Sequence, residues 1–551
     1  YFKTHDSQIN RDIGECPVCG NVNPEQIFTI MEAQVVDEFG RYTKKRKVSP
    51  TKWEERFSQV QSPPSPSVKK EVPQSKARAP GRIRQFTTYL TRDLKSKLAN
   101  SQYIAIVLLE SPVLALILAY IIRYIADPNS NVYIFRENEN IPIYIFMSMI
   151  VALFLGLTIS AEEIFRDRKL LKRDRYLHMS RLSYLSGKIA LLLSLSAFQA
   201  FVFVWIGNSI LGIRDMYFEY WLAFFSTAVF ANLLGLNISA SFNSAITIYI
   251  IIPLLIIPMM VLSGAMFSFD KLNRKISSVG KVPVIAELMA TKWSYEALMV
   301  HQFAGNRYEQ LLYDVEKAES NAYFKTVEYI PLLQQKLNLA INLMNIDRKD
   351  KEYADAILLL RNEIRSESEK MLPFALTDSL SPEAFNVGIA SLTRNYLRKL
   401  DEQYRSISQA ASLQKERIMD FYDKSDPELF TKLRRDYHNE SVSDIVRNVF
   451  ERHPILEYDH RLIRQYEPVF FDPRPSGWLD FRSHFYSPRK YFMGSYHPTF
   501  KFNTQVIWTM CLLLFVALYY EWLKKLIGFF DEIDLRKFNR FWVLGKIKKI
   551  T

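Results

Sequence analysis

The stretch from Ile141 to Lys188 decides the fold. It reads IPIYIFMSMIVALFLGLTIS from Ile141 to Ser160, and then AEEIFRDRKLLKRDRYLHMSRLSYLSGK from Ala161 to Lys188. The first part carries no charge and has the ~20 residues that an α-helix needs to cross the hydrocarbon of a membrane. The second part is rich in charge, but apolar residues recur in it at helical spacing, which predicts an amphipathic helix. The sequence therefore predicts a transmembrane helix that runs directly into a charged helix at the membrane surface.

Five further apolar stretches of similar length surround this one. Long, nearly charge-free blocks separated by charge-dense segments are the pattern of a polytopic membrane protein. Because buried helices of soluble proteins are rarely so long and so apolar, we expect a mainly α-helical fold with six transmembrane helices. The predicted spans are Tyr103–Ile122, Ile141–Ser160, Ile189–Leu211, Phe218–Ala240, Ile246–Phe267 and Thr504–Tyr520.

The basic residues indicate how the chain is oriented. The sequence has 71 Lys and Arg against 58 Asp and Glu. Nine of the basic residues lie in 69–97, seven in 161–187 and eight in 524–549, and six spans place all three segments on one side. Basic segments next to spans mark the cytoplasmic side. We expect an integral, multi-pass protein of a plasma membrane, the inner membrane of a bacterium, with both termini cytoplasmic and no nucleic-acid partner.

Residues 268–503 are expected to form a large helical extracytoplasmic insertion between the fifth and sixth spans. Apolar residues stand at helical spacing in EYIPLLQQKLNLAINLMNI and in YADAILLLRNEIRSESEKML. From His453 onward the segment is aromatic and rich in proline, which predicts an irregular, packed lobe close to the membrane. Such a domain could receive cargo, contact a periplasmic partner or cap an exit path.

The charged helix after the second span allows two interpretations. Its composition suits a helix that anionic lipid holds on the membrane surface. It also suits a helix on which a cytoplasmic partner docks.

Three segments resemble the ATP-binding-cassette (ABC) permeases of the G-subfamily type. EEIFRDRKLLKRDRYLHMSRLSYLSGKI follows the second span in the family's order of acidic residue, Phe, charged cluster, and then Tyr, Ser and Tyr. RQFTTYLTRDLKSKLAN, 84–100, is similar to the family's connecting helix, and TKWSYEALMVHQF, 291–303, to its segment after the fifth span. The resemblance implies an ABC-2 type permease fold, but the outer loop of such permeases is far smaller than 268–503.

The first residues resemble the C-terminal edge of the nucleotide-binding domain of that family. Tyr1-Phe2, Cys16-Pro17 and Asn23-Pro24 stand in the family's order before an apolar helix. The resemblance makes Cys16 a turn residue, and Cys16 and Cys19 lack the second ligand pair that a structural zinc site needs, so we expect no metal site.

No phosphate loop of the form G-x-x-x-x-G-K-[ST] occurs in the sequence, so we assign no catalytic residue and no cofactor to this chain. The resemblance implies ATP and Mg²⁺ for an associated ABC nucleotide-binding domain, upstream in the same protein or in a separate chain.

These observations predict five parts. Residues 1–57 are the edge of an ATP-binding domain, and 58–82 are a flexible linker rich in Pro and Ser. Residues 83–267 hold the connecting helix and five spans, 268–503 the extracytoplasmic domain, and 504–551 the sixth span with a basic cytoplasmic tail.

The resemblance also implies roles for particular residues. A helix at 161–180 would carry movement from the ATPase to the spans, with charged contacts to the ATPase surface. The residues predicted for these contacts are Glu162, Glu163, Arg166, Arg168, Arg173 and Arg175.

The second and fifth spans line the central cavity in that family. This implies that Phe146, Met149, Phe154, Met259 and Met260 are candidates for its wall, with ordinary packing as the alternative. Methionine adapts its shape, so such a wall suits varied apolar cargo.

Glu110 lies within the first span, where a carboxylate is costly. A functional role and a hydrogen-bonded contact with another helix both stay open for it.

The predicted function is the permease part of an ATP-driven ABC transporter, an exporter of lipid or other hydrophobic cargo that works as a homodimer in membrane lipid. One alternative is a mechanotransmitter that moves its outer domain against an envelope partner without cargo flux. A second alternative is a membrane anchor or receptor that does not transport.

Overall fold

The computed structural model describes residues 24–38, 40, 42–60, 80–127, 129–176, 179–346, 350–475 and 477–532, without a few of the side chains at the edges of these ranges. The chain divides into two compact units, 1–78 and 79–551. The predictions for Cys16 and Cys19, most of the predicted linker 58–82 and the tail after residue 532 lie outside the described residues.

The first unit contains two short helices and a hairpin. Helix α1 (Pro24–Glu32) precedes strands β1 (Gln34–Val36) and β2 (Tyr42–Arg46), which pair antiparallel, and helix α2 (Pro50–Ser58) follows. The Ser49 side chain caps α2 by accepting from the backbone N–H of Lys52, and Pro50 occupies the first helical position, where no hydrogen bond is lost. That this unit is the edge of an ATP-binding domain stays a prediction.

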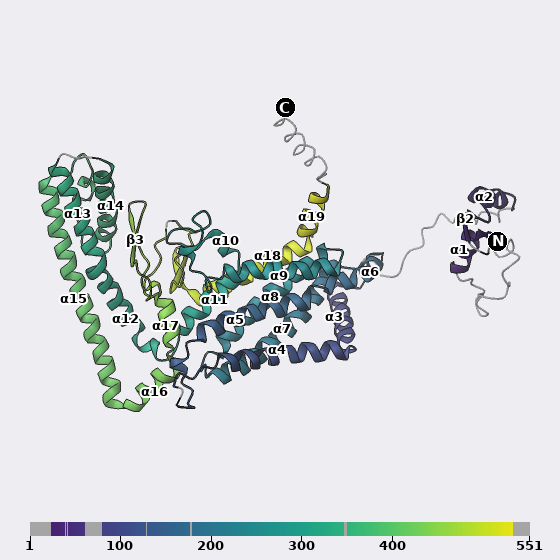
Figure 1. Cartoon of the computed structure of the whole chain (residues 1–551), viewed down its shortest axis with the longest axis horizontal. Coiled ribbons are helices and arrows are strands. Elements are labelled where there is room, and N and C mark those ends of the chain that lie inside the picture. Colours follow the sequence, from purple (N-terminus) through teal and green to yellow (C-terminus); the bar gives the residue numbers. More distant parts are fainter. Residues whose placement is uncertain are drawn as a thin grey trace. The chain divides into compact units, whose positions relative to one another are not determined.

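The second unit is built on long apolar helices that run side by side (Figure 1). Among the described residues, five helices are long and apolar enough to cross a membrane, and α6 continues the second of them. They are α4 (Ser101–Ile122), α5 (Ile141–Ser160), α7 (Arg181–Leu211), α8 (Tyr217–Ser241) and α18 (Thr499–Tyr519). The prediction of a mainly helical, polytopic fold is confirmed.

The predicted fifth span is shorter than expected. Helix α9 (Ala245–Val261) has 17 residues and ends at Val261 rather than at Phe267. Pro253 and Pro258 lie inside it, and proline removes a donor from the helix and weakens it. Beyond its end, Gly264 has a φ of 82°, a left-handed conformation that glycine adopts without strain.

Helices α5 and α8 form the centre of the bundle, where most of their residues are buried. Their backbones touch at Gly156, because a Cβ built there would lie 2.6 Å from the carbonyl oxygen of Ala228. Small residues at such contacts let membrane helices approach closely. The pair therefore fixes the frame on which the other spans pack.

One end of the bundle, which we call the α6 end, carries three helices that precede or follow the membrane spans. Helix α3 (Arg82–Leu98) precedes α4, and α6 (Glu163–Tyr176) follows α5. Helix α19 (Trp522–Glu532) follows α18 after a left-handed turn at Glu521. In Figure 1, α3 and α6 lie at the right-hand end of the bundle, and α19 stands above it beyond α18.

At the opposite end, the lobe end, the chain first returns to the bundle. The short α10 (Val284–Glu287) leads into α11 (Ala290–Ala304), which packs on α18, α8 and α5. Nearly every residue of α11 is buried, although it belongs to the segment predicted as extracytoplasmic. The insertion between α9 and α18 therefore begins within the helical bundle and leaves it only after Ala304.

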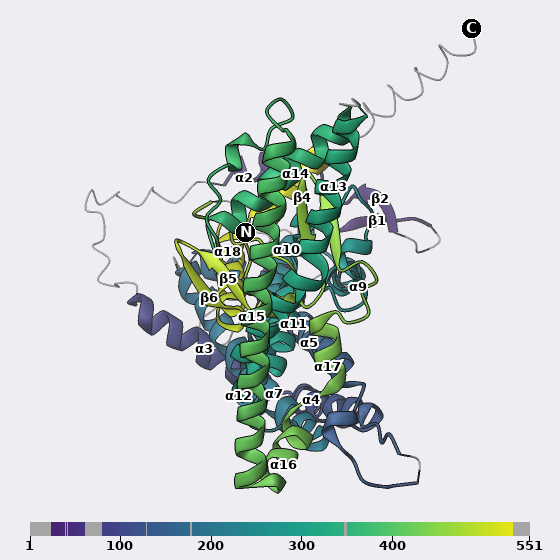
Figure 2. The same ribbon diagram turned by 90° about the vertical axis from the view of Figure 1, so that its left-hand side faces the viewer.

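The helical lobe that follows has its own apolar core. Figure 2 looks onto it, with the 39-residue helix α15 in front. Buried residues of α13, α14 and α15 pack together, among them Leu333, Leu360 and Leu397. The lobe helices are α12 (Glu309–Phe324), a π-helical turn (Lys325–Tyr329), α13 (Ile330–Asn345), α14 (Lys351–Ser368), α15 (Val387–Ser425), α16 (Pro427–Tyr437) and α17 (Glu440–Arg447).

Two antiparallel hairpins complete the aromatic part of the insertion. Strands β3 (Ile455–Tyr458) and β4 (Arg461–Arg464) form one, and β5 (Arg489–Phe492) and β6 (Ser495–Pro498) form the other. The second hairpin runs directly into α18, so it sits at the base of the last span.

Candidate functional site

At the α6 end, polar contacts join the first half of helix α6 to the end of α8. The Ser239 hydroxyl of α8 accepts from the backbone N–H groups of Ile164 (3.0 Å) and Phe165 (2.9 Å), which caps the start of α6. In return, the Arg168 guanidinium donates to the carbonyls of Ser239, Ala240 and Phe242 at the end of α8. Each helix thus satisfies free backbone groups at the end of the other, which fixes the start of α6 to the end of α8.

Helix α3 lies close against α7 on the other side of the site. Gly187 allows this, because a Cβ built there would meet the Leu90 backbone nitrogen at 3.3 Å. The Tyr89 and Tyr184 rings pack edge to face with centroids 5.4 Å apart. Tyr184 donates to Asp167 of α6 at 2.9 Å, so the same ring joins α3, α7 and α6.

A buried cluster of charges lies where these three helices meet. The Lys188 ammonium of α7 contacts Glu163 at 2.7 Å, Asp93 at 2.9 Å and Asp167 at 3.0 Å. Lys97 of α3 pairs with the other oxygen of Glu163. The side chains of Lys188 and Glu163 are 3% and 7% exposed, so water screens these pairs little. We call these five residues the α6-end cluster.

The pairing governs the charge states of the cluster. Burial alone would lower the pKa of Lys97, but the neighbouring Glu163 carboxylate more than offsets this and leaves the pKa raised. The cluster borders a cavity of about 140 Å³, and the buried Oδ2 of Asp93 has no hydrogen-bond partner among the described residues. Removing one of the two lysines would leave buried carboxylates without a counter-charge, which is strongly destabilising.

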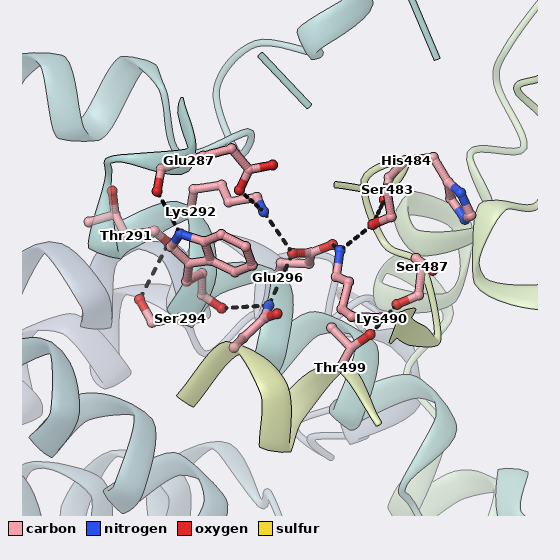
Figure 3. A network of polar contacts seen from close by, with 12 residues as sticks. Glu287, Thr291, Lys292, Ser294, Glu296, Ser483, His484, Ser487, Lys490 and Thr499 are labelled. Carbon is pink, nitrogen blue, oxygen red and sulfur yellow. Dashed lines mark hydrogen bonds and ion pairs between the residues drawn. The ribbon is translucent and has the colours of Figure 1, made fainter. Parts of the chain in front are cut away.

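A second buried network lies at the lobe end and joins the two segments by which the insertion leaves and re-enters the bundle. Figure 3 shows Glu296 of α11 between Lys292 and Lys490. Its carboxylate is 2.5 Å from the Lys490 ammonium and 3.3 Å from that of Lys292, and it accepts from Asn503 of α18 at 3.0 Å. Lys292 also contacts Glu287 at 3.0 Å. The network ties α11, β5 and α18 together.

Comparison with known families identifies the bundle. Residues 84–303 match the family model of the ABC-2 type transporter. A search of curated proteins found none that matches this chain. The matched residues, here called the ABC-2 segment, run from α3 to the end of α11 and include the α6-end cluster. Over these residues the chain is similar to the membrane domain of an ABC transporter permease, and its five long apolar helices together with this match make it an integral, multi-pass membrane protein.

The residues predicted to contact an ATPase occupy different environments within the ABC-2 segment. Glu163 and Arg168 are bound internally, as described above, and Glu162 is hydrogen-bonded to Tyr249 of α9. Arg166 borders the cavity of the α6-end cluster and is exposed. Arg173 is 71% exposed, and the side chain of Arg175 lies outside the described set. Contact with an ATPase stays a prediction for all six.

The residues predicted to line a cargo cavity lie on α5 and α9. Phe146, Met149 and Met259 are buried, Met260 is partly buried, and Phe154 is 44% exposed. Phe146 packs edge to face on Tyr295 of α11, with centroids 6.1 Å apart, and Met149 accepts from the Thr227 hydroxyl. Their role as a cavity wall stays a prediction.

Glu110 lies on α4 and is partly buried. Neither the functional role nor the hydrogen-bonded contact predicted for it is tested. The turn of α4 around it is tied to α7, because Ser111 donates to the Gln199 carbonyl at 2.7 Å and the Gln199 side chain donates to that of Val107 at 3.0 Å.

Four members of the α6-end cluster were not predicted as site residues: Asp93, Lys97, Asp167 and Lys188. Asp93 and Lys97 are four residues apart on α3, and so are Glu163 and Asp167 on α6, a spacing that places side chains on one helix face. Lys188 stands alone at the entry to an apolar span. These spacings indicate which side chains share a face of one helix. The contacts between the three helices arise only when the chain folds.

Proposed function

We propose that this chain is the permease part of an ATP-driven ABC transporter of the G-subfamily type, and that it exports lipid or other hydrophobic cargo. An ABC-2 permease domain normally pairs with an ABC ATPase, which would bind ATP and Mg²⁺ in its own domain. The observation that carries the proposal is the α6-end cluster, because it joins α3, α6 and α7 through a single buried ammonium. The active form would be a homodimer in the lipid bilayer.

The polar contacts of α6 support its role as the coupling element. Helix α6 presents Arg166, Lys169, Lys172 and Arg173 at its exposed face, while its other face is fixed to α8 and to the α6-end cluster. A push on the exposed face would therefore reach α8, and through α8 the central helix α5. The lipid-surface interpretation of the same helix would not require these fixed contacts.

Glu163→Gln in the complete transporter tests this proposal, because it removes the charge that Lys97 and Lys188 share. We expect permease-dependent ATP hydrolysis, and the ATP-driven flipping of a fluorescent phospholipid in proteoliposomes, to fall about tenfold, a change of ~1.4 kcal/mol. Glu139→Gln, an exposed carboxylate at the lobe end, is the matched control and should retain both activities.

The folded state of each variant is checked by thermal unfolding in the same membrane. A folded Glu163→Gln variant with wild-type hydrolysis and flipping would refute coupling through the cluster. If the wild-type transporter shows permease-dependent ATP hydrolysis but does not flip lipid, the proposal of a lipid exporter is refuted, whereas coupling through the cluster is not.

A mechanotransmitter is the second candidate function, and the lobe favours it. Helix α15 has 39 residues, a length of ~58 Å at 1.5 Å per residue. The lobe is joined to the bundle through Asn439, which donates to the carbonyls of Phe135 (2.8 Å) and Asn138 (2.9 Å) before α5. ATP-dependent displacement of labels on α15, with no flux of any tested cargo, would support this function over export.

A further inference from the structure

A cavity of about 280 Å³ lies at the lobe end, and none of the predicted site residues lines it. Its wall comes from the segment after α9, from α11 and α17, and from the residues around the two hairpins. It includes Gly264, Phe269, Tyr295, Asp444 and Phe485. We call it the lobe-end cavity. It combines the end of the ABC-2 segment with parts of the insertion.

Aromatic rings form much of this wall. The rings of Phe269 and Phe485 pack edge to face with centroids 4.9 Å apart, and the centroids of Phe485 and Tyr486 are 4.2 Å apart. Gly264 makes room for them, because a Cβ built there would stand 2.5 Å from the Phe485 ring. Aromatic faces are negative and attract cations that come within about 6 Å of the ring.

The charged groups of the wall are unequally paired. Lys281 is bound by Asp480 at 2.8 Å. Arg464 donates to the Tyr466 carbonyl at 2.6 Å and also to Asn321 and Ser320, and Glu467 lies 3.6 Å away. Both cations of the wall are therefore committed to partners outside the cavity.

The two carboxylates of the wall are not committed in this way. Neither the exposed Asp270 carboxylate nor the half-buried Asp444 carboxylate accepts a hydrogen bond or forms an ion pair within the described part of the chain. The charged neighbours of Asp270 are Glu451 and Lys271, and these two lie 3.9 Å from each other. His484 adds no positive charge, because burial and Lys490 lower its pKa to about 3. The free charge in the cavity is negative.

The cavity is connected to the membrane helices by the same rings. Tyr295 of α11 lines the cavity. The centroid of its ring lies 6.4 Å from that of Tyr486 and 6.1 Å from that of Phe146 of α5. A continuous row of aromatic side chains thus leads from the bundle core to the cavity.

We propose that the lobe-end cavity binds an organic cation with an apolar or aromatic body, the body against the rings and the charge at Asp270 and Asp444. That this cation is a cargo rests on the proposed export function, in which the cavity would be a binding site on the outward path. That the cavity binds the cation does not rest on it. Binding itself requires neither ATP nor a partner.

The test uses the full chain in nanodiscs and benzyltrimethylammonium as the probe, with isothermal titration as the readout. We expect saturable binding of this cation and at least tenfold weaker binding of phenylacetate, which has the opposite charge. The double variant Asp270→Asn and Asp444→Asn should lose at least tenfold in affinity. The double variant Asp401→Asn and Asp420→Asn changes the same net charge on α15 and should bind like the wild type.

Binding of phenylacetate as tight as that of the cation, or an unchanged affinity after both cavity substitutions in a folded protein, would overturn the proposal. Absence of saturable binding to the wild type would overturn it too. These outcomes are independent of the ATP-driven flipping assay, so the cavity proposal and the export proposal can fail separately.

Discussion

At Gly187, a missing side chain sets the distance between α3 and α7. A Cβ there already lies within 3.4 Å of α3 backbone and side-chain atoms, so a larger side chain must push the helices apart. We expect Gly187→Leu to lower the free energy of unfolding by about 1–3 kcal/mol, the usual cost of overpacking. Gly528→Leu is the control, because a Cβ at Gly528 meets nothing within 4 Å. Equal thermal stability of the two variants would contradict this packing argument.

Glu316 of the lobe is a single residue with a pH-dependent effect on stability. Its carboxylate lies 2.9 Å from Lys415, but burial and the neighbouring Glu309 raise its pKa from 4.5 to about 7. Between these values the folded lobe holds a proton that the unfolded chain releases, so stability falls as pH rises from about 4.5 to about 7.

Glu316→Gln removes that loss. We expect the free energy of unfolding of the variant to exceed that of the wild type by about 1–3 kcal/mol between pH 5 and pH 8, measured by denaturant unfolding. His438, whose pKa burial lowers to about 4, titrates in both proteins, so the comparison is between variant and wild type at each pH. A difference that does not change with pH would contradict the prediction.

At the residue scale, the sequence predicted the site only in part. It marked Glu163 and Arg168 from the charge pattern after the second span, and both occupy the junction of α6 with its neighbours. Their contact with an ATPase stays a prediction, and the internal contacts that both make in this chain were not foreseen. Lys188 and Asp93 could not be found, because their partners lie on other helices and only tertiary packing joins them.

At the scale of elements, Arg168 links two helices by donating to the carbonyls at the end of α8. Charge-assisted hydrogen bonds of this kind contribute about 1.5–3 kcal/mol each. We expect Arg168→Ala to increase hydrogen exchange in 163–176 and 238–242, because both helix ends lose partners. Arg173→Ala, on the exposed face of the same helix, should leave exchange unchanged. Unchanged exchange in Arg168→Ala would show that α6 is held by other contacts.

Helix positions followed from the sequence better than helix ends did. The long apolar runs of α4, α5, α7, α8 and α18 were predicted because length and hydropathy alone identify such helices. The end of α9 was missed because the apolar run continues past Val261, although the helix ends there. The hairpins β3–β4 and β5–β6 were missed because four-residue strands leave almost no periodic signal.

At the scale of the whole second unit, the structure separates the α6 end from the lobe end by the length of the bundle (Figure 1). The charge pattern predicts that α6 is cytoplasmic and the lobe is outside. We expect Lys172→Cys to be protected from a membrane-impermeant thiol reagent in intact cells, and Asp420→Cys on α15 to be labelled. Both variants should be labelled after the membrane is opened. The reverse pattern would invert the orientation and remove the basis for coupling at α6.

The Glu296 network has a consequence for how the outer domain is fastened to the membrane helices. The chain departs after α11 and comes back through β5, and Lys490 and Asn503 fasten these two points to the same carboxylate. The ion pairs of Glu296 therefore join the segments where the chain leaves the bundle and where it returns. Asn439 adds a third attachment through the carbonyls before α5, so any outer domain exchanged for this one would have to keep all three anchors for the membrane helices to hold their packing.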